Sequence, residues 1–165
     1  MIARLGGALA PGLLAFVLLA FGPGAPQRGF AQDILVSRET EIAIDRKAIA
    51  DLPVVEMKVG FETSKGRREA TYTGALLWSA LEKAGAFAGI DERARLGKSI
   101  TVIGKDGFRA SLAVAEIDPE FANKQVLIAY RSDGAPFPDN ELRLIVPGDK
   151  RGGRSVRNVA RLEIR

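Results

Sequence analysis

The chain has 165 residues, and its 24 Lys and Arg against 20 Asp and Glu give a formal net charge of +4, which is too small an excess to indicate nucleic acid as a partner. It contains no Cys and no His. These absences exclude disulfides, thiolate metal ligands, a Cys nucleophile and every catalytic arrangement that depends on an imidazole.

The first 31 residues are typical of a cleavable export signal. Arg4 precedes an uncharged stretch at 5–21, and a segment rich in Pro and Gly follows at 22–26. Small residues at the −3 and −1 positions predict cleavage between Ala31 and Gln32. Glycines and a proline interrupt the apolar stretch, which favours cleavage over a membrane span. We therefore expect a periplasmic or secreted protein with no membrane anchor after cleavage.

Removal of these 31 residues from 165 leaves 134, which is enough for one hydrophobic core. Residues 32–165 are therefore predicted to form a single domain. Arg4 and Arg28 are the only charged residues of the signal, so the mature net charge falls from +4 to +2. The signal has no pair of arginines, and this is typical of chains that are exported unfolded.

Apolar periodicity predicts the elements of the first half. In chain order they are a short strand at 41–45, one or two helical turns at 45–52, a strand at 54–61, a polar turn at 63–68, a returning strand at 68–73 and the principal helix at 75–84. On that helix, Leu77, Ala80, Leu81 and Ala84 recur at helical spacing, and Gly85 marks its end.

The second half is predicted to consist of strands at 99–103, 108–112, 126–130, 142–146 and 156–164. The first two of these flank Asp106 and Gly107, a pair that favours a hairpin turn. The fold class expected from both halves is α+β, mainly β, with one principal helix.

The segment 147–158 is the most unusual in composition, because it combines three glycines with Lys150, Arg151, Arg154 and Arg157. Such a loop can direct backbone N–H groups and guanidinium groups toward one anion. A solvated basic turn is the alternative.

Other polar residues are weaker candidates. Glu116, Asp118 and Glu120 could hold a hard cation such as calcium, although the end of a helix or turn explains them equally well. Lys65, Tyr72 and Tyr130 could act as acid–base groups only in the sense that nothing in the sequence excludes them.

Several segments together resemble the molybdopterin-binding domain of the sulfite oxidase family. In the family's order they are Tyr72–Gly85, Asp106–Phe108, Glu116–Pro119, Leu127–Tyr130 with Asp133–Pro136, and Leu142–Gly148. The similarity covers roughly residues 54–165. Each piece is short, but five in register are hard to obtain by chance.

The resemblance implies a mainly β fold with a molybdenum pterin cofactor in a basic pocket, where oxygen atoms move to or from small anions. Arg143, Ser155, Val156 and Arg157 fall where that family contacts the cofactor, and we add the neighbouring Arg154 to these expected cofactor-binding residues. We assign no catalytic residue and no metal ligand.

Two departures from the family count against catalysis. The family holds its metal through a cysteine, and the matching stretch here is Glu62, Thr63 and Ser64. A pocket histidine of the family would fall near Pro138 and is also missing. In addition, similar enzymes receive the cofactor in the cytoplasm and cross the membrane folded, so a chain exported unfolded would arrive without it.

These observations leave three hypotheses. The first is a non-catalytic binding module for a small anion, a pterin or a periplasmic protein partner, with no cofactor expected. The second is a molybdopterin-dependent oxidoreductase, which would bind its cofactor through pocket contacts alone or with an oxygen ligand from Thr63 or Ser64. The third is a structural or chaperone-like partner of another exported protein. The missing cysteine favours the first.

Overall fold

A computed structural model describes residues 40–165, all of which belong to one compact unit. The export signal and its cleavage bond, predicted at 1–32, lie outside the described residues. Among residues 40–165, no helix is long and apolar enough to cross a bilayer.

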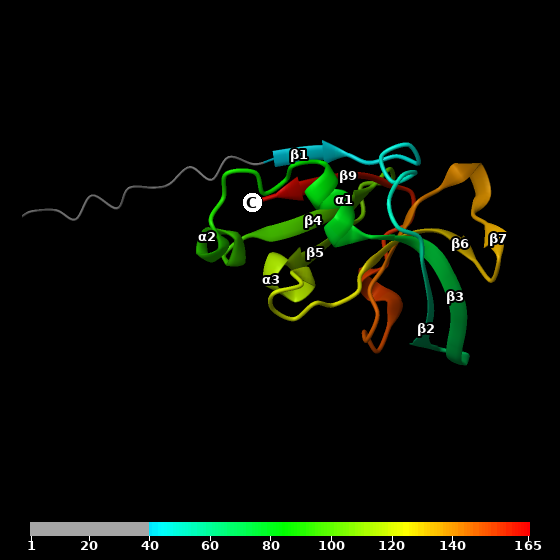
Figure 1. Cartoon of the computed structure of the whole chain (residues 1–165). Coiled ribbons are helices and arrows are strands. Elements are labelled where there is room, and N and C mark those ends of the chain that lie inside the picture. The colour runs from blue at the N-terminus through cyan, green and yellow to red at the C-terminus, as the bar shows by residue number, and fades with distance from the viewer. Residues whose placement is uncertain (1–39) are drawn as a thin grey trace, which may run out of the picture. The chain divides into compact units, whose positions relative to one another are not determined.

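Two antiparallel sheets make up most of this unit (Figure 1). The first sheet has the order β1-β9-β4-β5, formed by β1 (Thr40–Ala43), β9 (Val159–Ile164), β4 (Ser99–Gly104) and β5 (Arg109–Ala113). The second has the order β2-β3-β6-β7, formed by β2 (Val55–Thr63), β3 (Gly66–Leu76), β6 (Leu127–Ser132) and β7 (Ala135–Pro136), and β8 (Arg143–Ile145) also pairs with β6. The expected mainly β, α+β class is confirmed.

The helices are short. They are α1 (Leu77–Lys83), α2 (Glu92–Leu96) and α3 (Val114–Ile117), with 3-10 turns η1 (Pro138–Asn140) and η2 (Gly152–Arg154). The principal helix starts two residues later than predicted, because Ala75 and Leu76 still pair with β6. Its inward face is as expected at Leu77, Ala80 and Leu81, which are buried.

Two further expectations about local structure need correction. The helical turns predicted at 45–52 are consecutive hydrogen-bonded turns rather than a helix: the Asp45 carboxylate accepts from the Ala48 N–H at 2.8 Å, and Leu52 N–H donates to the Ile49 carbonyl at 3.2 Å. The short helix α2 was not predicted, although Asp91 begins it in an ordinary way by accepting from the Ala94 N–H at 2.9 Å.

The second sheet is apolar on both faces, because successive residues of a strand point to opposite sides. Ile128 of β6 lies in the main core together with α1 and the first sheet. Leu127 and Ala129, its neighbours in the chain, belong to a smaller cluster on the opposite face. Alternate residues of β2 share one face and belong to or pack against this smaller cluster: Val55, Met57, Val59 and Phe61.

The close pairing of β3 with β6 explains one glycine of the Tyr-Thr-Gly segment. The register shifts between Thr73 and Gly74, which brings the Gly74 backbone against its neighbour. A Cβ atom at Gly74 would collide with the Ile128 carbonyl oxygen and would lie 2.6 Å from Ala129 Cα. Only glycine fits this position.

Candidate functional site

The basic loop at 147–158 is fixed at both ends by backbone hydrogen bonds. Glu62 N–H, near the end of β2, donates to the Lys150 carbonyl at 2.8 Å. Leu144 N–H, on β8, donates to the Val156 carbonyl at 2.9 Å, and Val156 is fully buried. These bonds hold the loop beside the β2–β3 hairpin and β8.

A pocket of about 440 Å³ lies where these three elements meet, and we call it the arginine pocket. Its volume falls in the range of roughly 300–1,000 Å³ that small-molecule sites occupy. The lining residues are Phe61, Glu62, Thr63, Arg68, Glu69, Ala70, Tyr72, Asp133, Arg143, Ile145, Gly152, Ser155, Val156 and Arg157. Four of the five expected binding residues, Arg143, Ser155, Val156 and Arg157, therefore line one pocket.

The acidic residues of the arginine pocket are engaged by other partners. Glu62 pairs with Arg67 at 3.3 Å, and Glu69 pairs with Lys58 at 2.8 Å. The Asp133 carboxylate accepts from the Thr71 N–H at 2.8 Å. Neither Arg67 nor Lys58 lines the pocket. Glu62 and Glu69 are thus paired with cations outside the pocket, whereas Asp133 keeps its negative charge.

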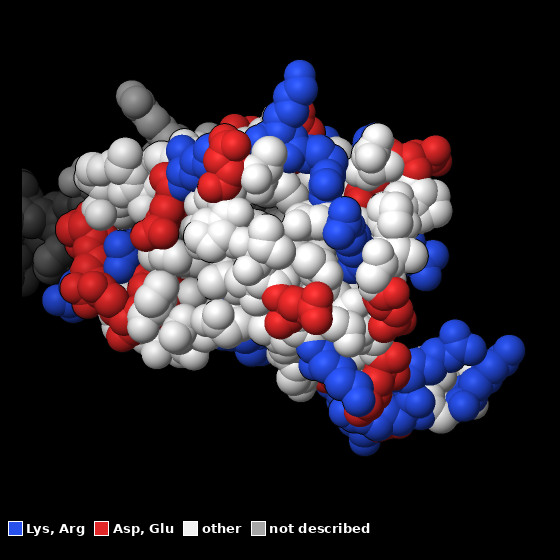
Figure 2. All heavy atoms as spheres, turned by 45° about the vertical axis from the view of Figure 1, so that its right-hand side comes forward, with Lys and Arg blue, Asp and Glu red and all other residues white. Residues whose placement is uncertain are grey.

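Two of the pocket's arginines have no such partner. Arg68 and Arg157 make no ion pair with any residue of the described range 40–165. Lys and Arg side chains gather over the protruding β2–β3 hairpin, at the lower right of Figure 2, and Arg68 belongs to this hairpin. The charge that remains available to a ligand is therefore positive.

Arg143 is held in a fixed orientation. Its Nε donates to Glu141 Oε1 at 2.7 Å and its Nη2 to Oε2 at 3.4 Å, while its guanidinium carbon lies 4.0 Å from the centre of the Phe137 ring. No hydrogen bond from its Nη1 to a described residue accompanies these contacts. One edge of the guanidinium is thus left for a ligand.

Glu141 is a mostly buried counter-charge, with a side chain that is 9% exposed. Burial alone would raise its pKa, but the hydrogen bond and charge of Arg143, the Asn158 N–H and the charge of Arg157 together lower the pKa below its ordinary value. The Asn158 N–H donates to Glu141 Oε1 at 3.2 Å. Glu141 is therefore ionised at neutral pH.

The hydroxyl of Ser155 makes no hydrogen bond within the described part of the protein. Its Oγ is buried and has no hydrogen-bond partner among the described residues. A buried hydroxyl without a partner costs roughly 1–3 kcal/mol. Ser155 lines the arginine pocket, but its Oγ has almost no accessible surface, so a ligand oxygen would reach it only after the side chain moves.

Arg154, the fifth expected residue, does not line the arginine pocket. Its Nε and Nη2 donate to the Asp149 carboxylate at 2.9 and 2.7 Å, and its Nη1 lies 3.3 Å from Glu116 Oε2. The hydrogen bond to Asp149 is the main reason that the pKa of Arg154 is raised. Arg154 thus connects two parts of the basic loop through Asp149 and attaches the loop to α3 through Glu116.

Sequence reasoning missed Arg68 as a pocket residue. Arg68 pairs with Phe61 of β2 and shares a strand face with Ala70 and Tyr72, both of which line the pocket. The sequence shows that Arg68, Ala70 and Tyr72 are alternate residues of one strand. What the sequence did not show is that the distant loop at 147–158 would lie against this end of the hairpin.

The donor set does not fit a thiolate-bound metal cofactor. Thr63 lies in the stretch that matches the family's cysteine and lines the pocket, but its Oγ1 donates to the Gly66 carbonyl at 2.7 Å and accepts from the Lys65 N–H at 3.1 Å. Ser64 is not among the lining residues. Nor does any group of three acidic residues in the described range 40–165 have the arrangement of a metal site. The donors present suit an anion instead.

Four of the remaining weak candidates contact basic side chains of the protein itself. Asp118 and Glu120 both contact Arg95, at 2.8 and 3.3 Å, and Glu116 contacts Arg154, so the three carboxylates face cations of the protein itself. Tyr130 lies under the Arg46 guanidinium, 3.8 Å from its carbon to the ring centre.

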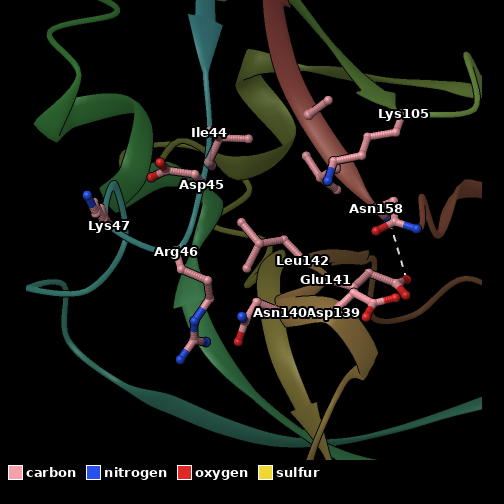
Figure 3. A pocket seen from close by; sticks show the side chains of 12 residues that line it. Ile44, Asp45, Arg46, Lys47, Lys105, Asp139, Asn140, Glu141, Leu142 and Asn158 are labelled. Atoms are coloured by element: carbon pink, nitrogen blue, oxygen red, sulfur yellow. Dashed lines mark hydrogen bonds between the residues drawn. The ribbon is translucent and has the colours of Figure 1, made fainter.

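A second hollow of about 410 Å³ is lined by residues 44–47, Lys105, 139–142 and 158–160 (Figure 3). Figure 3 shows Arg46 and Lys105 coming from different elements, with Leu142 between them. Glu141 belongs to this hollow while its carboxylate binds Arg143 of the arginine pocket. The hollow carries both signs of charge and has no fixed, unpaired group comparable to Ser155.

No family model matches the chain, and a comparison with curated proteins finds no match.

Proposed function

We propose that this protein is an exported, non-catalytic binding module with a sulfite oxidase-like fold, and that its arginine pocket holds a small oxyanion. The oxyanion is either free, as sulfate or phosphate, or part of a larger molecule such as the phosphate of a pterin. Both sources present the same chemistry to the pocket, which is a compact group of negatively charged oxygen atoms.

One observation carries the proposal: Arg68 and Arg157, which have no ion-pair partner in the described range, line one pocket with the fixed guanidinium of Arg143. Guanidinium groups bind oxyanions through paired, charge-assisted hydrogen bonds.

The resemblance to the sulfite oxidase family supports the same location. It assigns cofactor contacts to Arg143 and to residues 155–157, and it assigns the metal ligand to the stretch 62–64. These segments lie some 80 residues apart in the sequence, yet Glu62 and Thr63 line the same pocket as Arg143. In that stretch the Thr63 hydroxyl is used within the hairpin turn and Ser64 does not line the pocket, which favours binding over catalysis.

The test is calorimetric titration of the full chain, purified after export, with sulfate and phosphate. Arg157→Gln removes a pocket cation that makes no ion pair within the described range, and we expect at least a tenfold loss of affinity, the equivalent of one charge-assisted hydrogen bond. Arg151→Gln is the matched control, because Arg151 lies in the same loop but does not line the pocket. Equal losses in both variants, or no saturable binding by the wild type, would contradict the proposal.

A second measurement separates binding from catalysis. Protein purified from its native compartment is analysed for molybdenum by mass spectrometry and for pterin by fluorescence after acid release. We expect no stoichiometric molybdenum, with or without pterin. Stoichiometric metal together with pterin would instead support a molybdopterin-dependent oxidoreductase and would direct the search for its ligand to Thr63 and Ser64.

A further inference from the structure

The positive charge of Arg143 is already paired with Glu141 before any ligand binds. Its Nε and Nη2 edge is occupied by Glu141, at 2.7 and 3.4 Å, and the face of its guanidinium lies over Phe137. The pair is largely shielded from water, since the side chains of Arg143 and Glu141 are 25% and 9% exposed. An anion in the arginine pocket therefore experiences the negative charge of Glu141 as well as the positive charges of the arginines.

Glu141 cannot easily move away from this position. Its Oε1 also accepts from the Asn158 N–H at 3.2 Å, so Arg143 and the backbone of the basic loop hold the same carboxylate. The lowered pKa of Glu141 keeps the carboxylate charged at neutral and mildly acidic pH. The negative charge of Glu141 is thus fixed beside Arg143, although Glu141 itself does not line the arginine pocket.

A negative charge fixed beside the pocket changes which ligand charge gives the highest affinity. The attraction between an anion and the pocket grows in proportion to the ligand charge, whereas the cost of removing the anion from water grows with the square of that charge. Lowering the positive potential of the pocket moves the optimum toward a smaller ligand charge.

We infer that Glu141 is the specificity-determining residue of the arginine pocket and that it makes the pocket prefer singly charged oxyanions over doubly charged ones. This inference rests on the proposed anion-binding function and adds the ligand class to it. Glu141 acts on the ligand through its charge, without contacting it as a donor.

The test compares sulfate with methanesulfonate, in which one oxygen of the same tetrahedral group is replaced by a methyl group and the charge is reduced by one. Both are titrated into the full chain at constant ionic strength, because screening changes with salt. For the wild type we expect methanesulfonate to bind at least as tightly as sulfate. A clear preference of the wild type for sulfate would overturn the inference.

Glu141→Gln removes the charge but keeps an acceptor oxygen for Arg143 and Asn158. We expect it to raise the affinity for methanesulfonate about fivefold and, because the interaction energy doubles with the ligand charge, the affinity for sulfate about 25-fold. Glu82→Gln is the control for net charge, since Glu82 is exposed on α1, away from the pocket. An equal gain for both probes would indicate a change of shape rather than of charge and would overturn the inference.

Two outcomes distinguish this inference from the proposed function. If the wild type binds neither probe, or if Arg157→Gln changes nothing, the proposed function fails and the inference fails with it. If binding depends on Arg157 while Glu141→Gln leaves the ratio of the two affinities unchanged, only the inference fails. Glu141→Asp, which retains the charge, is expected to keep the wild-type ratio and separates charge from side-chain length.

Discussion

The buried pair between Asp118 and Arg95 connects α3 to α2 and offers a quantitative test of the fold. The Asp118 side chain is completely buried, and its Oδ2 lies 2.8 Å from Arg95 Nε. Its Oδ1 accepts from the Glu120 N–H at 3.0 Å. The Arg95 guanidinium carbon also lies 5.4 Å from the centre of the Trp78 ring. Removal of either partner should therefore loosen the contact between the two short helices.

The two single substitutions are expected to differ in cost. Arg95→Met leaves the Asp118 carboxylate buried without its cation, and breaking a buried pair in this way costs roughly 3–5 kcal/mol. Because the Arg95 side chain is 18% exposed and water reaches one side of the pair, we expect about 3 kcal/mol, at the lower end of that range. Asp118→Asn keeps an oxygen for the Glu120 N–H and leaves Arg95 beside Glu120, so we expect about 2 kcal/mol.

The double variant distinguishes pairing from packing. With both charges gone, the total loss should fall short of the sum of the single losses by at least about 1 kcal/mol, since the uncompensated charge is removed as well. Urea denaturation followed by far-UV circular dichroism measures the free energies of unfolding and avoids the fluorescence of the nearby Trp78. Additive losses, or a larger loss from Asp118→Asn than from Arg95→Met, would refute the reasoning.

Two further predictions concern the basic loop and the β3–β6 pairing. The hydrogen bond from Arg154 holds the pKa of Asp149 below its usual value, so the pair stabilises the folded state above about pH 4 and loses this effect as the pH falls through the folded-state pKa. Asp149→Asn should therefore melt below the wild type at pH 7, with a gap that narrows under acid conditions; a gap independent of pH would contradict this. Gly74→Ala should destabilise the domain by about 3 kcal/mol, because its Cβ would meet unyielding backbone. In the same melting assay Gly153→Ala, which has open space around its Cβ, should change little.

The sequence was most informative where a single local pattern decides the structure. The face of β2 that carries Val59 and Phe61 follows from strict alternation, and the inward face of α1 follows from the spacing of Leu77 and Leu81. The start of α1 was predicted less well. Ala75 and Leu76 are good helix residues, but hydrogen bonds to a strand about 50 residues later keep them in β3.

The candidate site also shows that a local sequence pattern does not reveal contacts with distant residues. Arg154 and Arg157 lie in one loop and have the same side chain, so composition cannot say which of them meets a ligand. The difference comes from Asp149 and Glu116, which engage Arg154 and leave Arg157 free of ion pairs within the described range. Glu116 is 38 residues away in the chain. A local pattern contains no information about such a partner.

A metal–pterin site must both bind an anionic group and hold a metal, and the arginine pocket has donors suited only to the first of these tasks. The proposed oxyanion would require only converging donors of positive charge, and Arg68, Arg143 and Arg157 line one pocket. A molybdenum centre of the kind that the resemblance implies would also require a soft, free donor at a fixed position. Thr63 stands near that position, but its hydroxyl closes the β2–β3 turn, and a thiol there would be a poor substitute because it is a weak hydrogen-bond donor and acceptor. The Thr63 hydroxyl is thus committed to the hairpin turn, and a soft, free donor is lacking at the position that matches the cysteine of the sulfite oxidase family.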